Sequence, residues 1–189
     1  MKTEKTSTAP VRNLKELYEL YSGSVFNYLI SVSGNRELAE DLTGETFYRA
    51  MLAIDSFRGE SSVKTWLIRI ARNLYLRLME RERRKVPLDD LPQQKRRLIS
   101  DHSDPESQFF WKERARIISM ALLSLSERDR TLLHLSIREE MSCKEVGEVL
   151  GLSVSAVKVR RYRARRRFIQ ALEKDKKENV SKEDKNDQL

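Results

Sequence analysis

Apolar residues recur at steps of three and four through most of the chain, which is the period of an amphipathic helix. The first apolar stripe predicts a helix that stops at SGNRE (33–37), and it consists of Leu14, Leu17, Tyr18, Tyr21, Val25, Leu29 and Val32. Asn35 can cap a second helix, which runs to about Ile54 and carries Leu38, Leu42, Phe47 and Met51. After the loop DSFRGESS (55–62), a third helix ends in the basic run at 81–85.

The helical period stops at residue 86 and returns at about residue 109. The segment between contains three prolines and no sustained period, which is typical of a linker. A further helix is predicted from Phe109, Phe110, Ile117, Ile118, Ala121, Leu122 and Leu125. Ser126 with Asp129, and Ser142 with Glu145, have the spacing of side-chain pairs that start helices.

These patterns predict an all-α chain with two small helical domains joined by a flexible linker. Only six glycines and four prolines, together with abundant Leu, Arg, Glu and Ala, favour helices over sheets. The tail after Glu173 alternates in charge and holds almost no apolar residue, which predicts disorder. The predicted parts are a disordered N-terminus at 1–12, a domain at 13–85, a linker at 86–108, a domain at 109–172 and a disordered polar tail at 173–189.

The charge of the chain points to a polyanionic partner. The formal net charge is +8, which makes nucleic acid and an anionic membrane surface the two candidates. Residues 109–172 carry a net charge of +7, whereas the predicted linker carries −2. Cys143 is the only cysteine, so no intramolecular disulfide can form. We interpret His102 and His134 as ordinary residues, and we expect neither a metal site nor a cofactor.

The N-terminal residues MKTEKTSTAPVRN lack the apolar core of a signal peptide. Apolar stretches elsewhere are far shorter than the roughly 20 residues that span a bilayer. We therefore expect a cytoplasmic protein that does not insert into membranes.

Residues 142–165, SCKEVGEVLGLSVSAVKVRRYRAR, have the spacing of a helix-turn-helix motif. A short helix turns Val146 inward, and Gly147 is small where a second helix has to pass closely. Gly151 suits a left-handed turn, and Ser153 can cap the second helix. The second helix of such a motif lies in the major groove of DNA, with its early side chains at base edges.

Seven cations lie between Lys158 and Arg167. A solvated helix face is the ordinary explanation of such a run, but its place directly after the turn favours DNA binding. Tyr162 and Arg163 share one exposed face with Lys158, and the flanking arginines suit phosphates, because phosphates can replace their counterions. Arg161 falls on the inward stripe of this helix, and the DNA-binding interpretation does not account for it.

Two segments resemble the extracytoplasmic-function sigma factors of bacterial RNA polymerase. AEDLTGETFYRAMLAIDSFRGESSVKTWLIRIARNLYLRLMERERR (39–84) resembles their region 2, and LSLSERDRTLLHLSIREEMSCKEVGEVLGLSVSAVKVRRYRARRRF (123–168) resembles their region 4. The resemblance covers nearly all of 13–172. It implies a protein that is not an enzyme but binds core RNA polymerase, directs it to promoters and helps to open the DNA.

The resemblance also implies roles for individual residues. Region 4 would read the duplex −35 element through Ser155, Lys158, Val159, Arg160, Tyr162, Arg163, Arg166 and Arg167. Region 2 would read the −10 element, with one base flipped out, through Phe57, Arg58, Ser61, Lys64, Arg69 and Asn73. For Asn73, an exposed helix residue without a role is the plainer alternative.

An acidic ridge of Glu37, Asp41 and Glu45 follows four-residue steps along the second predicted helix. Acids favour a helix N-terminus, which explains Glu37 but hardly Glu45. The resemblance implies that this ridge docks on the clamp of the largest polymerase subunit, and that the flap of the second largest subunit is a further partner. Gly44 stands where the family commonly has glutamine, and Arg161 stands where an aliphatic residue is usual.

Three other classes of protein remain as alternatives. An ordinary helix-turn-helix regulator explains 123–168 but leaves 39–84 without a role. An enzyme would need a Gly-rich phosphate loop, a nucleophile–base pair or a metal cluster, and the sequence contains none of these. A membrane-surface protein would need a bulkier apolar face opposite its basic residues. The sequence leaves open which promoters are read and whether an anti-sigma factor is a further partner.

Overall fold

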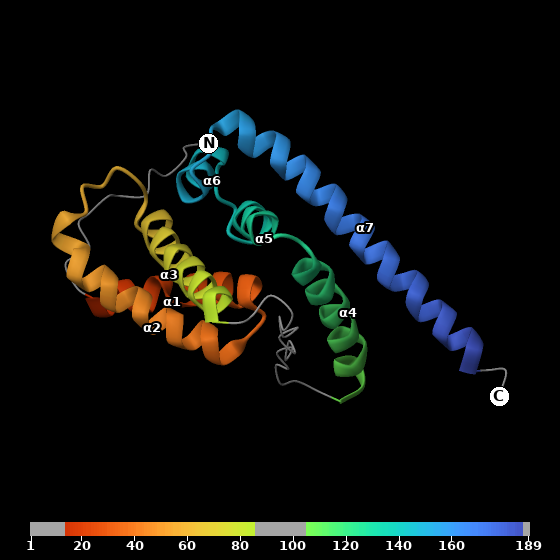
Figure 1. The fold of residues 1–189 in the computed structure, drawn as a ribbon. Coiled ribbons are helices and arrows are strands. Elements are labelled where there is room, and N and C mark those ends of the chain that lie inside the picture. The colour runs from red at the N-terminus through yellow and green to blue at the C-terminus, as the bar shows by residue number, and fades with distance from the viewer. Residues whose placement is uncertain (1–13, 86–104, 187–189) are drawn as a thin grey trace, which may run out of the picture.

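The computed structural model describes residues 14–85 and 105–186, and the regular structure in these ranges is helical (Figure 1). The all-α prediction is therefore confirmed. Most of the predicted linker lies outside the described residues. The elements are α1 (Leu14–Ser33), α2 (Arg36–Ala53), the 3₁₀ turn η1 (Ile54–Ser56), α3 (Val63–Lys85), α4 (Pro105–Ser124), α5 (Glu127–Leu133), the π-helical turn η2 (His134–Arg138), α6 (Cys143–Leu150) and α7 (Val154–Asn186).

The first three helices pack around a shared apolar core, with α3 lying across α1 and α2 (Figure 1). Asn35 caps α2 as predicted, because its Oδ1 accepts a hydrogen bond from the backbone N–H of Leu38 at 3.1 Å. The predicted stripe of α1 is right at its centre but wrong at its start. Leu14 and Tyr18 are 41% and 49% exposed, whereas Tyr28, which the prediction omitted, is completely buried.

In the second half of the chain, α5, α6 and α7 begin where the sequence predicts. The Oγ of Ser126 accepts from the backbone N–H of Asp129, and Ser153 caps α7 in the same way. Ser142 and Glu145 form a complete capping box, in which each side chain accepts a hydrogen bond from the backbone N–H of the other. These caps satisfy N–H groups that have no partner within the helix.

The turn between α6 and α7 depends on two glycines. Gly151 has φ 66° and ψ 43°, the left-handed conformation that ends a helix and that side chains disfavour. At Gly147 a Cβ would lie only 2.5 Å from the backbone oxygen of Leu152. Gly147 was predicted to let a second helix pass closely, but the closest neighbour is the backbone of the turn itself.

Two predicted boundaries differ from the structure. α4 begins at Pro105, inside the predicted linker, because proline suits the first turn of a helix. α7 continues to Asn186, past the predicted end of the second domain at residue 172. Glutamate and lysine dominate this stretch, and both are good helix formers.

The turn η2 changes which side chains face inward. Leu132 and Leu133 are buried, but Ile137 is 63% exposed, although it follows Leu133 at a four-residue step. A π-helical turn accommodates more residues than an α-helical turn, so it rotates the following side chains away from the original stripe.

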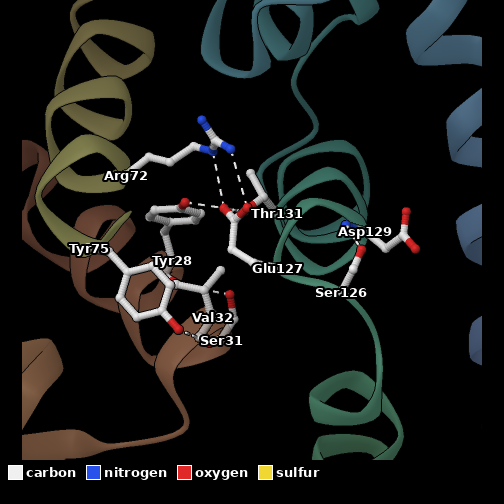
Figure 2. A network of polar contacts seen from close by, with 9 residues as sticks. All are labelled: Tyr28, Ser31, Val32, Arg72, Tyr75, Ser126, Glu127, Asp129 and Thr131. Atoms are coloured by element: carbon white, nitrogen blue, oxygen red, sulfur yellow. Dashed lines mark hydrogen bonds and ion pairs between the residues drawn. The ribbon is translucent and has the colours of Figure 1, made fainter. Parts of the chain in front are cut away.

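The two halves of the chain are packed against each other through α1 and α3 on one side and α5 and α6 on the other. Figure 2 shows the polar centre of this contact, where Arg72 of α3 meets Glu127 of α5. Tyr28 of α1 lies beside this pair, and its hydroxyl is 3.2 Å from the Oγ1 of Thr131. Burial raises the pKa of Tyr28, so its hydroxyl stays protonated and available for this hydrogen bond.

His134 is buried at the same interface, with its ring edge-to-face against Tyr28 at 5.8 Å. Its Nε2 lies 3.5 Å from Glu139, without hydrogen-bond geometry, and has no other partner among the described residues. Burial lowers the pKa of His134 to about 4, and the nearby charge of Glu139 opposes this shift without cancelling it. His134 is therefore neutral at physiological pH.

Gly147→Ala should lower the free energy of unfolding by roughly 1–3 kcal/mol, because the new Cβ forces the turn apart. Gly44→Ala is the matched control in α2, since a Cβ there meets nothing within 4 Å. This control should raise the free energy of unfolding by up to about 1 kcal/mol. Urea unfolding of both variants measures the difference, and equal stability of Gly147→Ala and the parent would contradict the close approach.

Acidification should destabilise the chain through His134. The unfolded histidine takes up a proton near its usual pKa of 6.5, whereas the folded one does so only near 4, so stability present above pH 6.5 is lost as the pH falls toward 4. The lowered pKa of Glu139 acts in the same direction below its usual value of 4.5. Thermal unfolding at pH 7 and at a pH near 5 should show a smaller decrease in Tm for His134→Gln than for the parent. An identical decrease in both proteins would show that His134 does not carry this dependence.

Candidate nucleic-acid interface

The helix-turn-helix of α6 and α7 presents a basic face to solvent. Val157 and Ala164 are completely buried against the rest of the second half, so the opposite face of α7 points outward. Val159 and Tyr162 on that face are 51% and 64% exposed. Seven of the eight residues predicted to contact the −35 element are exposed and Arg160 is half-buried; the exposed ones are Ser155, Lys158, Val159, Tyr162, Arg163, Arg166 and Arg167.

Two arginines of α7 differ from the sequence interpretation. Arg161 was expected on the inward stripe, but it is exposed, because the buried contacts of this helix are made by Val157 and Ala164. Arg167 was predicted to meet phosphate, yet its guanidinium donates to Asp129 of α5 at 2.7 Å. Its side chain remains 57% exposed, so the ion pair holds α7 on α5 and still leaves part of the guanidinium open.

In the first half, a polar pocket of about 270 Å³ lies at the loop between η1 and α3. Four of the six residues predicted to contact the −10 element line it, namely Phe57, Arg58, Ser61 and Arg69. The ring of Phe57 lies 4.8 Å from that of Trp66. The sequence interpretation missed Ser56, Glu60 and Trp66 as lining residues, although all three lie in or beside the loop that it selected.

The other two residues predicted to contact the −10 element lie outside this pocket. Asn73 is exposed on α3, one helical turn after Arg69, so both side chains can face the same ligand. Lys64 turns away toward the second half of the chain, where its Nζ forms an ion pair with the carboxylate of Glu139. The structure therefore brings together five of the six predicted residues along one surface.

The predicted acidic ridge lies on the outer side of α2. Glu37 and Asp41 are exposed, while Glu45 is half-exposed and pairs with Arg49 at 2.6 Å. Tyr48 and Leu52 are 54% and 67% exposed, and their spacing continues the same helix face. The sequence interpretation assigned apolar residues only to the core and therefore missed Tyr48 and Leu52. Both continue the ridge from Glu45 at steps of three and four residues.

Among the residues that the structure describes, no group of three or more His, Cys, Asp or Glu could hold a metal ion. Within the same ranges, no helix combines the length and the apolar character that crossing a membrane requires.

Comparison with known proteins finds a matching protein family for each half of the chain. Residues 17–85 match Sigma-70 region 2, and residues 115–168 match Sigma-70, region 4. The chain is 28% identical to the RNA polymerase sigma factor YlaC of Bacillus subtilis over 88% of this chain and 95% of that protein. It is 31% identical to the ECF RNA polymerase sigma factor SigW of the same organism over 79% of this chain and 83% of that protein.

A solved structure supports the same fold. The sigma factor RpoE, in complex with the anti-sigma factor NepR from Bartonella quintana, superimposes with a TM-score of 0.68 at 24% identity, over 86% of this chain and 98% of that chain. Because both sequence matches follow the order and the boundaries of the two helical halves, this chain belongs to the extracytoplasmic-function (ECF) sigma factors of bacterial RNA polymerase.

Proposed function

We propose that this chain binds core RNA polymerase in the cytoplasm, recognises −10 and −35 promoter elements and promotes DNA opening. The observation that carries the proposal is the presence, in one chain, of two different surfaces suited to DNA. One is the exposed basic face of α7, and the other is the pocketed loop before α3. An ordinary helix-turn-helix regulator would need only the first surface.

The face of α7 suits the major groove of the −35 element. Lys158, Tyr162 and Arg163 lie early on the exposed side, where side chains of a recognition helix meet base edges. Arg166 lies one turn further on, with its guanidinium 6.0 Å from the centre of the Tyr162 ring. We assign Arg166 to phosphate, since residues later in the helix leave the groove floor.

The pocket of about 270 Å³ suits a base of the −10 element that has left the duplex. Aromatic rings and polar groups line it, and this is the combination with which proteins hold an extruded or single-stranded base. Arg58 and Arg69 at its edge supply positive charge toward the neighbouring phosphates. Asn73 extends the same surface along α3.

The outer face of α2 suits the clamp of the largest polymerase subunit. The acidic ridge supplies charge for steering, and the exposed Tyr48 and Leu52 supply apolar area for a stable contact. We assign the second half of the chain to the flap of the second largest subunit. The acidic linker at 86–108 would cross a basic surface of the polymerase between these two sites. The alternative is that the linker acts as a plain tether.

An anti-sigma factor is a further partner that we propose. The similar sigma factor RpoE was solved in complex with the anti-sigma factor NepR, and the similar CnrH was solved in complex with the cytosolic domain of CnrY. In this chain a pocket of about 530 Å³ lies between α1 and the second half, with Ile30, Ile118 and Leu122 among its apolar lining residues. Such a pocket between the two regions can receive apolar side chains of a bound helix.

Run-off transcription with purified core polymerase tests the proposed function. The parent should direct specific transcripts from promoters selected out of a random library, and core polymerase alone should not. Arg69→Ala, at the pocket, should reduce DNA opening measured by permanganate reactivity of unpaired thymines. Arg77→Ala is the matched control, because it removes the same charge from the exposed side of α3 two turns away. Equal opening by both variants would remove the pocket from −10 recognition.

A second experiment should distinguish the residues of α7 that read bases from those that bind phosphates. Arg163→Ala should lose roughly 1–3 kcal/mol of discrimination at one base pair of the −35 element. Arg166→Ala should weaken binding to all sequences alike and reduce the salt slope by about 1. Arg167 is unsuitable as the phosphate variant, since its ion pair with Asp129 also holds α7 in place.

The measurement is the affinity of polymerase reconstituted with each variant for a −35 duplex and its single-base variants, over a series of salt concentrations. Uniform weakening by both substitutions would mean that α7 anchors the DNA electrostatically and that Arg163 does not read a base.

A further inference from the structure

One cation of the recognition helix is tied to an acid. Of the seven between Lys158 and Arg167, Arg167 is the only one that forms an ion pair within the described ranges of the chain. Its Nη1 donates to Oδ2 of Asp129, in the first turn of α5, at 2.7 Å. The guanidinium of Arg166 lies instead over the ring of Tyr162. Arg167 thus has a fixed direction before any DNA is bound.

The carboxylate of Asp129 is itself fixed. Its side chain is only 11% exposed, and the backbone N–H of the same residue donates to the Oγ of Ser126 at 3.2 Å. The first turn of a helix favours negative charge, because its unpaired N–H groups carry partial positive charge. Figure 2 shows Asp129 on the side of α5 opposite to Glu127 and Thr131, so it faces away from the contact with region 2. Asp129 is therefore a rigid acceptor directed at α7.

The guanidinium of Arg167 remains largely open. Its side chain is 57% exposed, and the described residues provide no second polar partner for it. A guanidinium carries five N–H donors in a planar fork, of which Asp129 uses one. Because the fork is rigid, an acceptor at one end fixes the direction of the remaining donors. Arg167 can therefore donate to a second anion without release from Asp129.

Arg167 lies at the edge of the face that we assign to DNA. It follows Arg163 by four residues, so the two side chains lie on the same side of α7, one turn apart. It also follows the buried Ala164 by three residues, which places it on the flank of the helix rather than on its outermost line. Phosphates border the groove on either side of a recognition helix, and contacts to them fix the orientation of the protein. A phosphate is therefore the anion that this position suits.

We propose that Asp129 is a positioning residue that orients Arg167 toward a phosphate bordering the −35 element. This inference rests on the proposed function, because it takes α7 as the helix that binds promoter DNA. An unrestrained arginine loses side-chain freedom when it binds phosphate, which lowers the affinity by about two- to tenfold. Asp129 removes much of this freedom beforehand, so an acid beside the DNA-binding helix increases the affinity for DNA.

Substitution of Asp129 tests this role, because simple electrostatics predicts an effect of the opposite sign. Core polymerase is reconstituted with each full-length variant, and its affinity is measured for a −35 duplex, its single-base variants and a duplex of unrelated sequence. Asp129→Ala should weaken binding to all of them by about two- to tenfold, although it removes a negative charge. Asp129→Asn keeps an acceptor oxygen at the same place and should weaken binding less. Glu173→Ala is the matched control, since it removes an exposed acid of α7, and it should not weaken binding.

The effect should act through Arg167. In an Arg167→Ala background, Asp129→Ala should cause no further loss of affinity, because no guanidinium remains to be oriented. The preference among single-base variants should survive in Asp129→Ala, because the buried Val157 and Ala164 still hold α7 against the core. A purely structural role would instead change this preference. Circular dichroism verifies that each variant keeps its helices, and Asp129→Asn carries the comparison with the parent if Asp129→Ala unfolds.

Three outcomes would overturn the role of Asp129: equal or tighter binding by Asp129→Ala, the same loss in the Arg167→Ala background, or an altered base preference. Failure of the proposed function is a separate result. If the parent bound the −35 duplex no better than the unrelated one, while Asp129→Ala weakened both, α7 would not read the −35 element. Asp129 would in that case still orient Arg167 toward the phosphates of DNA.

Discussion

The arrangement of this sigma factor depends on one buried ion pair between two small helical regions. Arg72 and Glu127 are largely removed from solvent, and desolvation of charge is costly unless geometry and further hydrogen bonds compensate for it. Both conditions are met here, since the pair is bidentate and the hydroxyl of Thr131 donates a further hydrogen bond to the carboxylate of Glu127. Removal of one partner would leave the other charge buried without compensation, so loss of either residue weakens the contact between the two regions.

The helix α5 connects this interface to the proposed DNA-reading surface of α7. Figure 2 shows Glu127 and Thr131 directed toward α1 and α3, whereas Asp129 points to the opposite side of α5. On that side Asp129 accepts from Arg167 of α7. One short helix, capped by Ser126, thus fixes both the partner region and the recognition helix. The helix α5 therefore links the contact with region 2 to the proposed DNA-binding face of α7.

Local physics made much of this structure predictable. The helix starts at Asn35, Ser126 and Ser142 follow from side-chain capping, and the turn at Gly151 follows from its backbone freedom. Tyr28 was missed although it continues the three- and four-residue steps of α1. The pairing of Arg72 with Glu127 was not predictable, because exposed arginines and glutamates are common and one sequence carries no information on which of them meet across a fold. The exposure of Ile137 depends on a π-helical turn that no local residue pattern indicated.

A double-mutant cycle on the unfolding free energy tests most directly whether the two regions hold each other. Arg72→Ala, Glu127→Ala and the double variant are unfolded in urea in the free, full-length form. Interacting residues show coupling energies of about 0.5–3 kcal/mol, whereas distant residues are additive to within about 0.5 kcal/mol. The structure predicts a coupling energy of about 1 kcal/mol or more, with the two regions unfolding together. Additive effects of the two substitutions would show that the regions do not contact each other through this pair and would contradict the account.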